Sequence, residues 1–344
     1  MSSAKKIRIG ITWGDPNGIG SECILKALAG WGRGVDAGTA GDWTPVIYGN
    51  AAELRRQAGF FGVVLDAETE AACVDVVSEL KPNWGAAEQA AGDIARASLE
   101  RAIRDLKAGA IDALVTAPIN KDTIQGDGFS FPGHTEYLAE AAGVADVLMF
   151  LVSSDLRVGI VTGHIPISQV AAAITPEAIE RKYALMRASL KLDFGIDEPR
   201  IAVLGLNPHA GDNGLIGGEE LAVIGPTIRS FQAAGHRVEG PFGADGFFGN
   251  GAYKHFDGVL AMYHDQGLAP FKSLAFGSGI NFTAGLPWVR TSPDHGTAFD
   301  IAGKNLASGN ALRGACLGAI EIGIKRRLIP CNGTPIFAPP SSKG

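Results

Sequence analysis

The residues best equipped for chemistry are concentrated in one stretch of the chain, Tyr263–Lys304. It contains the pairs His264–Asp265 and Asp294–His295, together with a lysine, an asparagine and an arginine that glycines and prolines separate. Side chains spaced in this way belong to loops, and loops carry function disproportionately often. Imidazoles and carboxylates can bind metals or move protons, while two cations and an amide can bind an anion. The stretch therefore predicts a site for an anionic small molecule.

An apolar run directly before this stretch indicates how its residues are positioned. The run Gly258–Met262 is typical of a buried parallel strand, so His264 and Asp265 follow its carboxyl end. Ligands in open α/β sheets bind at that edge. The polar residues that come next are Lys272, Asn281 and Arg290.

Earlier strand ends carry the same kinds of side chain. The apolar run 111–116 leads into the sequence APINK, which contains Lys121, and the motif FPGHTE then supplies His134 and Thr135. Asp245 lies in a further glycine-rich loop. By the logic of parallel sheets, these loops are also expected at the ligand-binding edge.

Three histidines share one context, since each lies within a few residues of the end of an apolar strand. They are His164 in TGHIP, His209 in NPHAG and His264 in YHDQG. Their separations form no local metal motif, and a hydrogen-bonded or surface role would explain each of them as well. Their shared context makes them candidates for convergence.

Strands alternate with amphipathic helices along the whole chain, which predicts an α/β fold with a largely parallel sheet. The length of 344 residues is long for one core and indicates two lobes around a cleft. The turn WGDPNGIG joins the first strand to the first helix, but its spacing matches neither the GxGxxG nor the GxxxxGK[ST] phosphate motif.

Composition excludes several other classes of protein. There are 30 basic and 36 acidic residues, a net charge of −6, and no basic cluster, so nucleic acid is not an expected partner. No apolar run approaches the ~20 residues of a membrane span, and the start MSSAKKIRIGITWG lacks the apolar region of a signal peptide. A cytoplasmic protein without membrane contact is expected. The cysteines, which form no CxxC motif and are expected as free thiols, are Cys23, Cys73, Cys316 and Cys331.

Several motifs resemble those of a known family. The sequence SPDHGTAFDIAGK is similar to the adenosine-binding loop of the isocitrate and isopropylmalate dehydrogenase superfamily, which binds NAD(P) without a Rossmann glycine fingerprint. GDPNGIGSE, VTAPINK, FPGHTE, YHDQGLAPFK and GLPWVRTSPDHGTAFDIAGK together resemble the 4-hydroxythreonine-4-phosphate dehydrogenases, oxidative decarboxylases of pyridoxal phosphate biosynthesis. These motifs extend from Gly10 to Lys304 in the order that the family has.

The resemblance implies a two-lobed fold with the active site in the interdomain cleft. One domain, which carries the cofactor loop, would comprise residues 1–130 and 285–344. The other, residues 131–284, would carry the metal-binding histidines and the dimerisation surface.

The resemblance also implies roles for individual residues. His164, His209 and His264 would bind a divalent metal in a homodimer whose metal site is shared between subunits, with His264 supplied by the partner. Three imidazoles suit zinc; cobalt and nickel also fit, while magnesium prefers carboxylates. The expected substrate-binding residues are His134, Thr135, Lys272, Asn281 and Arg290. The residues expected to bind NAD or NADP, called here the candidate cofactor loop (295–300), are His295, Gly296, Thr297, Ala298 and Asp300.

The implied substrate is a small phosphorylated hydroxy amino acid, 4-phosphohydroxy-L-threonine. Oxidation of its C3 hydroxyl by NAD or NADP would give a β-keto acid, which loses carbon dioxide to form 3-amino-2-oxopropyl phosphate. The metal would acidify the hydroxyl and then polarise the new carbonyl. The catalytic base stays open between Asp245, Asp265, Lys121 and a metal-bound water.

Other activities are compatible with parts of the pattern. Relatives within the family act on threonate or erythronate phosphate, or on a cis-dihydrodiol dicarboxylate, and they keep the same histidines and cofactor loop. Phosphate acetyltransferases share the general fold without NAD or metal, and a non-catalytic binding protein is a further class. The intact set of three histidines argues against these last two.

Overall fold

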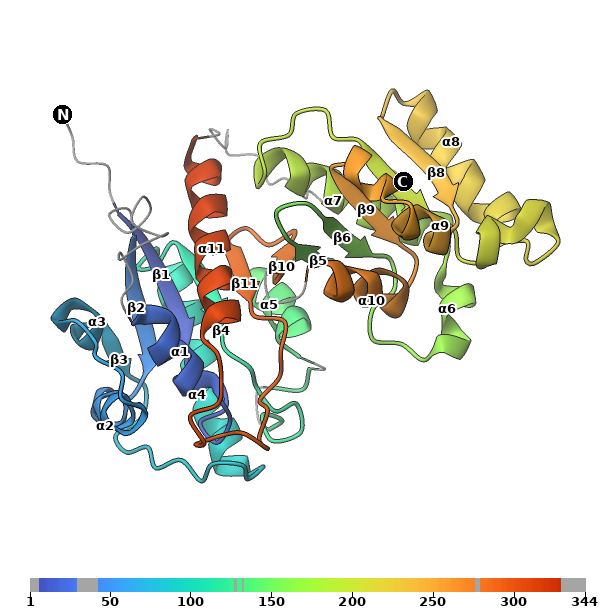
Figure 1. Ribbon diagram of the computed structural model, residues 1–344. Helices are drawn as coiled ribbons and strands as arrows, with labels where there is room; N and C mark the ends of the chain where they lie inside the picture. Colours follow the sequence, from blue (N-terminus) through green and yellow to red (C-terminus); the bar gives the residue numbers. More distant parts are fainter. Residues whose placement is uncertain (1–5, 30–42, 127–128, 132, 276–278, 329–344) are drawn as a thin grey trace. The chain divides into compact units, whose positions relative to one another are not determined.

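The structure is a computed structural model that describes residues 6–29, 43–126, 129–131, 133–275 and 279–328 (Figure 1). Cys331 therefore lies outside the described residues. The chain divides into two compact units: residues 1–142 with 287–324, and residues 143–286 with the chain from Lys325 onward. Both units combine a sheet with helices, so the expected α/β class with largely parallel strands is confirmed.

The first unit contains a parallel sheet. Its strands, in spatial order, are β3 (Cys73–Asp75), β2 (Trp43–Gly49), β1 (Ile7–Thr12), β4 (Ala113–Thr116) and β11 (Val289–Ser292). Every one of these pairings is parallel. All strands therefore end at the same edge, where loops can place ligand-binding side chains.

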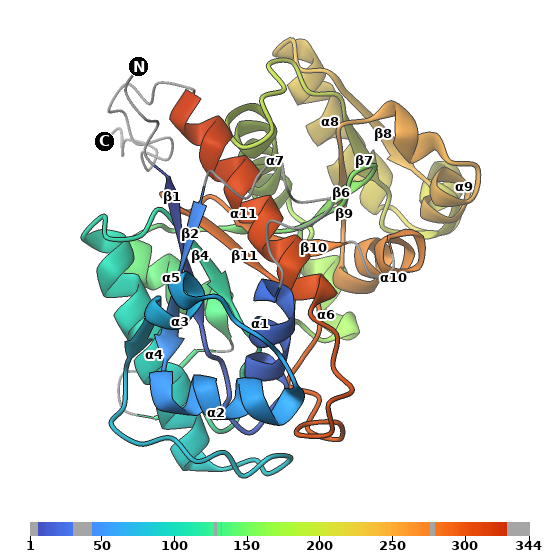
Figure 2. The same ribbon diagram turned by 60° about the vertical axis from the view of Figure 1, so that its left-hand side comes forward.

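Helices cover this sheet. They are α1 (Gly20–Leu28), α2 (Ala51–Phe61), α3 (Ala67–Ala71), α4 (Gln89–Lys107), α5 (His134–Ala142) and α11 (Asn310–Leu328). Both views show α11 running alongside β11 (Figures 1 and 2), and the Thr291 hydroxyl donates to the Ala315 carbonyl over 2.8 Å. On α4, Ser98 accepts from the Trp13 N–H and donates to the Tyr48 carbonyl, so it joins the ends of β1 and β2.

Local sequence explains where helices begin and end. The Asn50 side chain accepts a hydrogen bond from the Glu53 N–H and caps α2, which ends at Gly62 with a φ of 68°. Thr175 caps the first turn of α7 (Pro176–Leu192) in the same way, accepting from the Ala178 N–H, and a proline follows it at the first helical position.

The second unit contains a mixed sheet. Its strands, in spatial order, are β10 (Ile280–Ala284), β5 (Leu148–Val152), β6 (Arg157–Ile160), β9 (Gly258–Ala261), β7 (Ile201–Leu204) and β8 (Val238–Phe242). The pairings of β5 with β10 and with β6 are antiparallel, whereas β6, β9, β7 and β8 pair in parallel. Four parallel strands thus share one carboxyl edge.

The remaining helices belong to this unit. Beside α7 they are α6 (Ile167–Ala173), α8 (Gly225–Ala233), α9 (Ala244–Gly249), α10 (His264–Leu274), the 3₁₀ segments η2 (Pro208–Gly214) and η4 (Ala252–His255), and the π-helical η3 (Glu220–Ile224). A buried apolar cluster joins α10 to the strands through residues such as Phe271, Val158 and Val259. None of the helices in the described residues is both long enough and apolar enough to cross a membrane.

Gly92 allows α4 to pack closely on the loop that follows β4. A Cβ atom at Gly92 would collide with the Thr123 backbone carbonyl, whereas one at Gly59 on α2 would meet nothing within 4 Å. We expect Gly92→Ala to lower the free energy of unfolding by about 2 kcal/mol through overpacking. Gly59→Ala, the matched control, should raise it by up to about 1 kcal/mol. Urea unfolding measures the change in the free energy of unfolding for each variant. Equal changes in Gly92→Ala and Gly59→Ala would contradict the close packing at Gly92.

Candidate functional site

Three neighbouring strands of the second unit are tied together where they end. The pairing of β6 with β9 continues past the strands, since the Thr162 N–H donates to the Met262 carbonyl over 3.1 Å. The Gln266 side chain then joins β9 to β7, because it accepts from the Met262 N–H at 2.7 Å and donates to the Gly205 carbonyl at 2.6 Å. The histidines that follow these ends are His164 after β6, His264 after β9 and His209 after β7.

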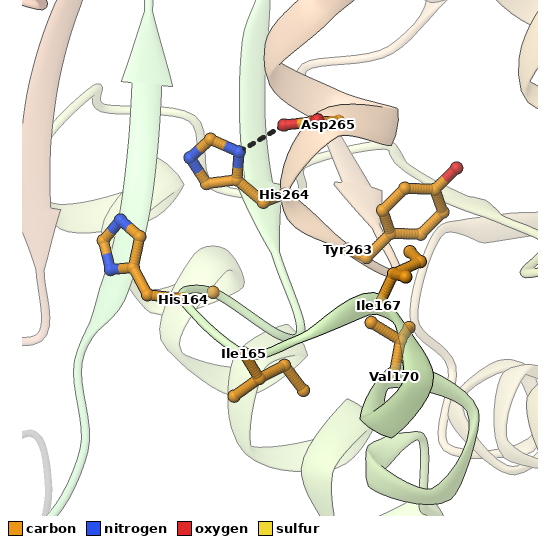
Figure 3. A pocket seen from close by; sticks show the side chains of 8 residues that line it. His164, Ile165, Ile167, Val170, Tyr263, His264 and Asp265 are labelled. Atoms are coloured by element: carbon orange, nitrogen blue, oxygen red, sulfur yellow. Dashed lines mark hydrogen bonds and ion pairs between the residues drawn. The ribbon is translucent and has the colours of Figure 1, made fainter.

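Two of these histidines lie together in a pocket. The rings of His164 and His264 have centroids 5.5 Å apart, and they line a cavity of about 300 Å³ with Tyr263 and apolar residues of α6 (Figure 3). His264 Nδ1 lies 2.7 Å from Asp265 Oδ1, and in the neutral tautomer whose Nδ1 donates to this carboxylate, Nε2 keeps a lone pair. Asp265 is thus a partner that orients the His264 ring.

This pair suits a divalent metal. Two imidazoles bound to one tetrahedral zinc, with Zn–N distances of about 2.05 Å, have ring centroids about 5 Å apart. The observed separation of 5.5 Å between His164 and His264 is close to this value. Among the described residues of one chain, however, no group of three His, Cys, Asp or Glu side chains could hold a metal ion. The structure therefore supplies two donors at this position.

His209 lies in η2, next to α9. A Cβ atom added at Gly243 would be 3.4 Å from His209 Cα and 3.5 Å from Asp245 Oδ1, so Gly243 lies between these two residues. Asp245 is exposed in the first turn of α9. His209 thus follows the same sheet edge as the other two histidines without joining them in a cluster.

The first unit holds a buried cation at its own strand ends. Arg290 lies on β11 opposite Leu114 of β4, is 3% exposed, and donates from Nη2 to Thr116 Oγ1 over 2.6 Å. Burial lowers the pKa of the Arg290 guanidinium to about 10, while the Glu136 carboxylate acts in the opposite direction. At neutral pH the side chain keeps its charge, so this is a desolvated cation suited to binding an anion.

His134, the first residue of α5, lies beside this cation. Burial lowers the pKa of its imidazole well below the ordinary value, and the positive charges of Arg290 and Lys121 lower it further. Its Nε2 atom is buried and has no hydrogen-bond partner among the described residues. The Lys121 side chain passes close by, since its Cε would lie 3.8 Å from a Cβ at Gly133. The structure therefore brings His134, Lys121 and Arg290 together.

The other expected substrate-binding residues are placed as follows. Thr135 is the second residue of α5, half-buried. Lys272 is exposed on α10, and Asn281 is half-buried on β10 opposite Leu151. His134, Thr135 and Arg290 thus belong to the first unit, while Lys272 and Asn281 belong to the second.

The candidate cofactor loop packs on the turn that follows β1. The Ile19 N–H donates to the Thr297 carbonyl over 3.0 Å, and the neighbouring Ala298 has a φ of 43°. Asp300 is exposed, whereas His295 Nε2 is buried without a hydrogen-bond partner among the described residues. Buried polar atoms normally have a hydrogen-bond partner. The buried Nε2 of His295, in a loop packed on the turn between β1 and α1, could therefore bind a polar ligand such as a nicotinamide cofactor.

Asp15 is absent from the expected site residues, yet it connects two of the site's loops. Its N–H donates to the Pro118 carbonyl over 2.9 Å, and its carboxylate accepts from the Asn17 N–H and the Thr123 hydroxyl. Burial raises the pKa of Asp15 despite these hydrogen bonds. One feature of the sequence could have identified Asp15 as a candidate: it provides the carboxylate of the turn WGDPNGIG. Thr116 and Glu136, the partners of Arg290, likewise gain their roles only from the fold.

Comparison with known proteins identifies the family. A family model described as pyridoxal phosphate biosynthetic protein PdxA matches residues 42–319. A 4-hydroxythreonine-4-phosphate dehydrogenase from Bacteroides thetaiotaomicron is 50% identical over 329 residues, covering 92% of this chain and 89% of that relative.

Solved structures are similar in fold as well. The 4-hydroxythreonine-4-phosphate dehydrogenase from Klebsiella pneumoniae matches with a TM-score of 0.77 at 37% identity, covering 93% of this chain and 100% of that chain. A terephthalate 1,2-cis-dihydrodiol dehydrogenase from Burkholderia xenovorans matches with a TM-score of 0.61 at 31% identity, covering 92% and 98%.

The fold, the strand-end site and these relatives define an α/β enzyme of the dehydrogenase class, an oxidoreductase. Within that class, the chain belongs to the PdxA family of pyridoxal phosphate biosynthetic proteins. The resemblance stated from the motifs is thereby confirmed.

The lowered pKa of His134 makes stability depend on pH. The unfolded chain binds a proton at this imidazole near pH ~6.5, whereas the folded chain does not, so the free energy of unfolding falls as the pH drops below that value. When the pH is lowered from about 7.5 to 5.5, the free energy of unfolding should fall by about 1 kcal/mol less in His134→Gln than in the unsubstituted protein. Urea unfolding at both pH values measures this difference.

Exposed His255 provides the control, because His255→Gln should keep the full pH dependence. Identical pH dependence in His134→Gln and the unsubstituted protein would contradict a buried, neutral His134.

Proposed function

We propose that this protein oxidises 4-phosphohydroxy-L-threonine at C3 with NAD or NADP and a divalent metal, and that decarboxylation then gives 3-amino-2-oxopropyl phosphate. The observation that carries the proposal is the buried Arg290, which sits beside neutral His134 in a chain of the PdxA family. A buried guanidinium at the carboxyl edge of a parallel sheet is suited to binding an anionic ligand. The phosphate and the carboxylate of this substrate are such groups.

The residues of the first unit bind and orient the anion. Arg290 donates to Thr116 from Nη2, so its guanidinium is held in a set direction rather than freely rotating. Lys121 adds a second positive charge, and the imidazole of His134, which stays neutral, can donate a hydrogen bond without adding to the repulsion between the cations. Thr135 supplies a neighbouring hydroxyl at the start of the same helix.

His164 and His264 would hold the metal, with His209 of the partner subunit as the third imidazole. His264 was expected to come from the partner, but its ring lies beside that of His164 in the same chain, which favours His209 as the shared ligand. Zinc suits such a set; cobalt and nickel also fit. When bound, the metal supplies Lewis-acid polarisation of the substrate's hydroxyl and carbonyl oxygens.

A homodimer accords with the apolar surface near His209. Leu215 is 82% exposed, Leu221 is 59% exposed, and the two lie around Gly214, whose added Cβ would be 2.9 Å from Leu221 Cδ1. Large apolar side chains grouped in this way are suited to an interface. We call Leu215, Ile216 and Leu221 the apolar patch, and we place it in the dimer contact.

The candidate cofactor loop would bind NAD or NADP, which accepts the hydride. His295 offers its buried Nε2 to the cofactor, and Thr297 keeps the loop against the turn after β1. Of the candidate bases, Asp265 is engaged with His264 Nδ1, so we assign it to ring orientation. Proton removal then stays open between Asp245, Lys121 and a metal-bound water; Lys121 could act as the base only in its neutral form, whereas it carries a positive charge when it binds the anion.

A dihydrodiol dicarboxylate is the second candidate substrate, favoured by the similarity to the terephthalate dihydrodiol dehydrogenase. A panel of 4-phosphohydroxy-L-threonine, threonate phosphate, erythronate phosphate and a cis-dihydrodiol dicarboxylate separates these activities. With zinc and each nicotinamide in turn, the first compound should give the highest kcat/KM. Preference for a different compound would assign the protein to that activity instead.

The metal role predicts a specific loss in His264→Ala. Removing one of two adjacent donors should lower zinc content and abolish turnover, since imidazole supplies the proposed coordination. His255→Ala, which removes an exposed histidine, is the matched control. Zinc per subunit and nicotinamide reduction measure the effect, and full zinc content with full activity in His264→Ala would refute the site.

A further inference from the structure

The segment that carries His209 has an uncommon backbone conformation. Six consecutive residues have positive φ: His209 at 52°, Ala210 at 52°, Gly211 at 80°, Asp212 at 42°, Asn213 at 55° and Gly214 at 90°. Only two of them are glycines. Residues with a Cβ are disfavoured in this left-handed region, and they normally enter it singly rather than in a run. We call residues 209–213 the left-handed turn; its conformation needs stabilising contacts from outside the turn.

Glu220 makes contacts of this kind at the base of the turn. Its Oε1 accepts from the Leu206 N–H at 2.7 Å and from the Asn207 N–H at 2.8 Å. Its Oε2 accepts from Asn207 Nδ2 at 2.9 Å. The Asn207 carbonyl in turn accepts from the Ala210 N–H, inside the turn. One carboxylate therefore fixes the residues from which the left-handed turn departs.

The surroundings of Glu220 fit it closely to this position. The residue is 4% exposed, and a Cβ atom at Gly211 would lie 2.6 Å from its Oε2. Gly205 is close on the other side, where an added Cβ would lie 3.1 Å from Oε1 and 2.9 Å from Ala210 Cα. Burial alone would raise the pKa of Glu220, but the hydrogen bonds from Asn207 and Leu206 outweigh it and keep the carboxylate charged.

Neighbouring Glu219 makes a much weaker connection. Its Oε2 accepts from the Asn207 side chain at 2.8 Å, and among the described residues no backbone N–H group donates to its carboxylate. The two adjacent carboxylates therefore differ in their contact with the backbone: buried Glu220 holds the backbone at the start of the turn, whereas half-buried Glu219 does not. This difference provides a matched control.

We propose that Glu220 is a positioning residue for His209: it holds the left-handed turn in the conformation that presents this imidazole to the metal. The inference rests on the proposed function in that His209 is taken as a metal ligand. Glu220 touches neither substrate nor metal in this account. It acts through Asn207 and the turn, as a group behind a ligand that fixes the ligand's orientation.

The test compares Glu220→Gln with Glu219→Gln and His209→Ala, each made in the whole 344-residue chain. Cobalt(II) is the probe, because its visible absorption spectrum reports the coordination of the ion. We expect Glu220→Gln to weaken cobalt binding about 10- to 100-fold and to change the spectrum, as loss of an orienting partner does. Glu219→Gln should retain the native spectrum and affinity.

Hydrogen exchange in the metal-free protein is the second measurement. The amides of Leu206 and Asn207 should exchange faster in Glu220→Gln and at the native rate in Glu219→Gln, because only Glu220 accepts from them. Gly211→Ala covers the case in which Glu220→Gln does not fold. Its Cβ would displace the carboxylate without removing its charge, and it should change the cobalt spectrum in the same direction.

The outcomes distinguish two claims: that His209 is a metal ligand, and that Glu220 positions it. Native cobalt binding in His209→Ala would reject His209 as a ligand and, with it, the metal site under the proposed function. A changed spectrum in His209→Ala, with native spectra in both Glu220→Gln and Gly211→Ala, would overturn the role of Glu220 alone. Faster exchange together with a changed spectrum in Glu220→Gln would support it.

Discussion

Parallel pairing of β6, β9 and β7 is the constraint on which the positions of the three histidines in the second unit depend. Because the strands are parallel and adjacent, their carboxyl ends meet at one edge, and the Gln266 side chain ties the last two ends together. Histidines far apart in sequence therefore follow neighbouring points of the sheet. Where each imidazole then points is decided locally, by Asp265 for His264 and by Glu220 for His209 in our account.

In the first unit, the main constraint is a positive charge that is buried away from solvent. Arg290 is nearly inaccessible to solvent, and its hydrogen bond to Thr116 fixes the plane of its guanidinium. The cost of desolvation lowers the pKa of both Arg290 and His134, and the positive charge of Arg290 lowers the pKa of His134 further. An anionic substrate would offset this desolvation, so binding energy and electrostatics favour the same class of ligand.

The sequence allowed the α/β class and the strand-end position of the candidate residues to be predicted, because short apolar runs followed by polar loops are local signals. Asp265 was expected among the candidate bases, whereas its contact with His264 Nδ1, which only the fold reveals, is the reason for the orienting role that we propose. Glu220 could not be predicted, since its importance comes from two N–H groups 13 and 14 residues away and from a turn with positive φ. The pairing of His164 with His264 rather than with His209 likewise depends on loop geometry, which sequence spacing does not encode.

The central claim is that one metal-dependent site both oxidises and decarboxylates a phosphorylated hydroxy amino acid. The most direct measurement follows nicotinamide reduction and carbon dioxide release together, with 4-phosphohydroxy-L-threonine, in metal-stripped protein and after zinc is restored. The account predicts that both signals vanish on stripping and return with zinc in equal molar amounts. Two results would contradict it: the absence of both signals from the zinc-restored protein with NAD and with NADP, or undiminished turnover by the stripped protein.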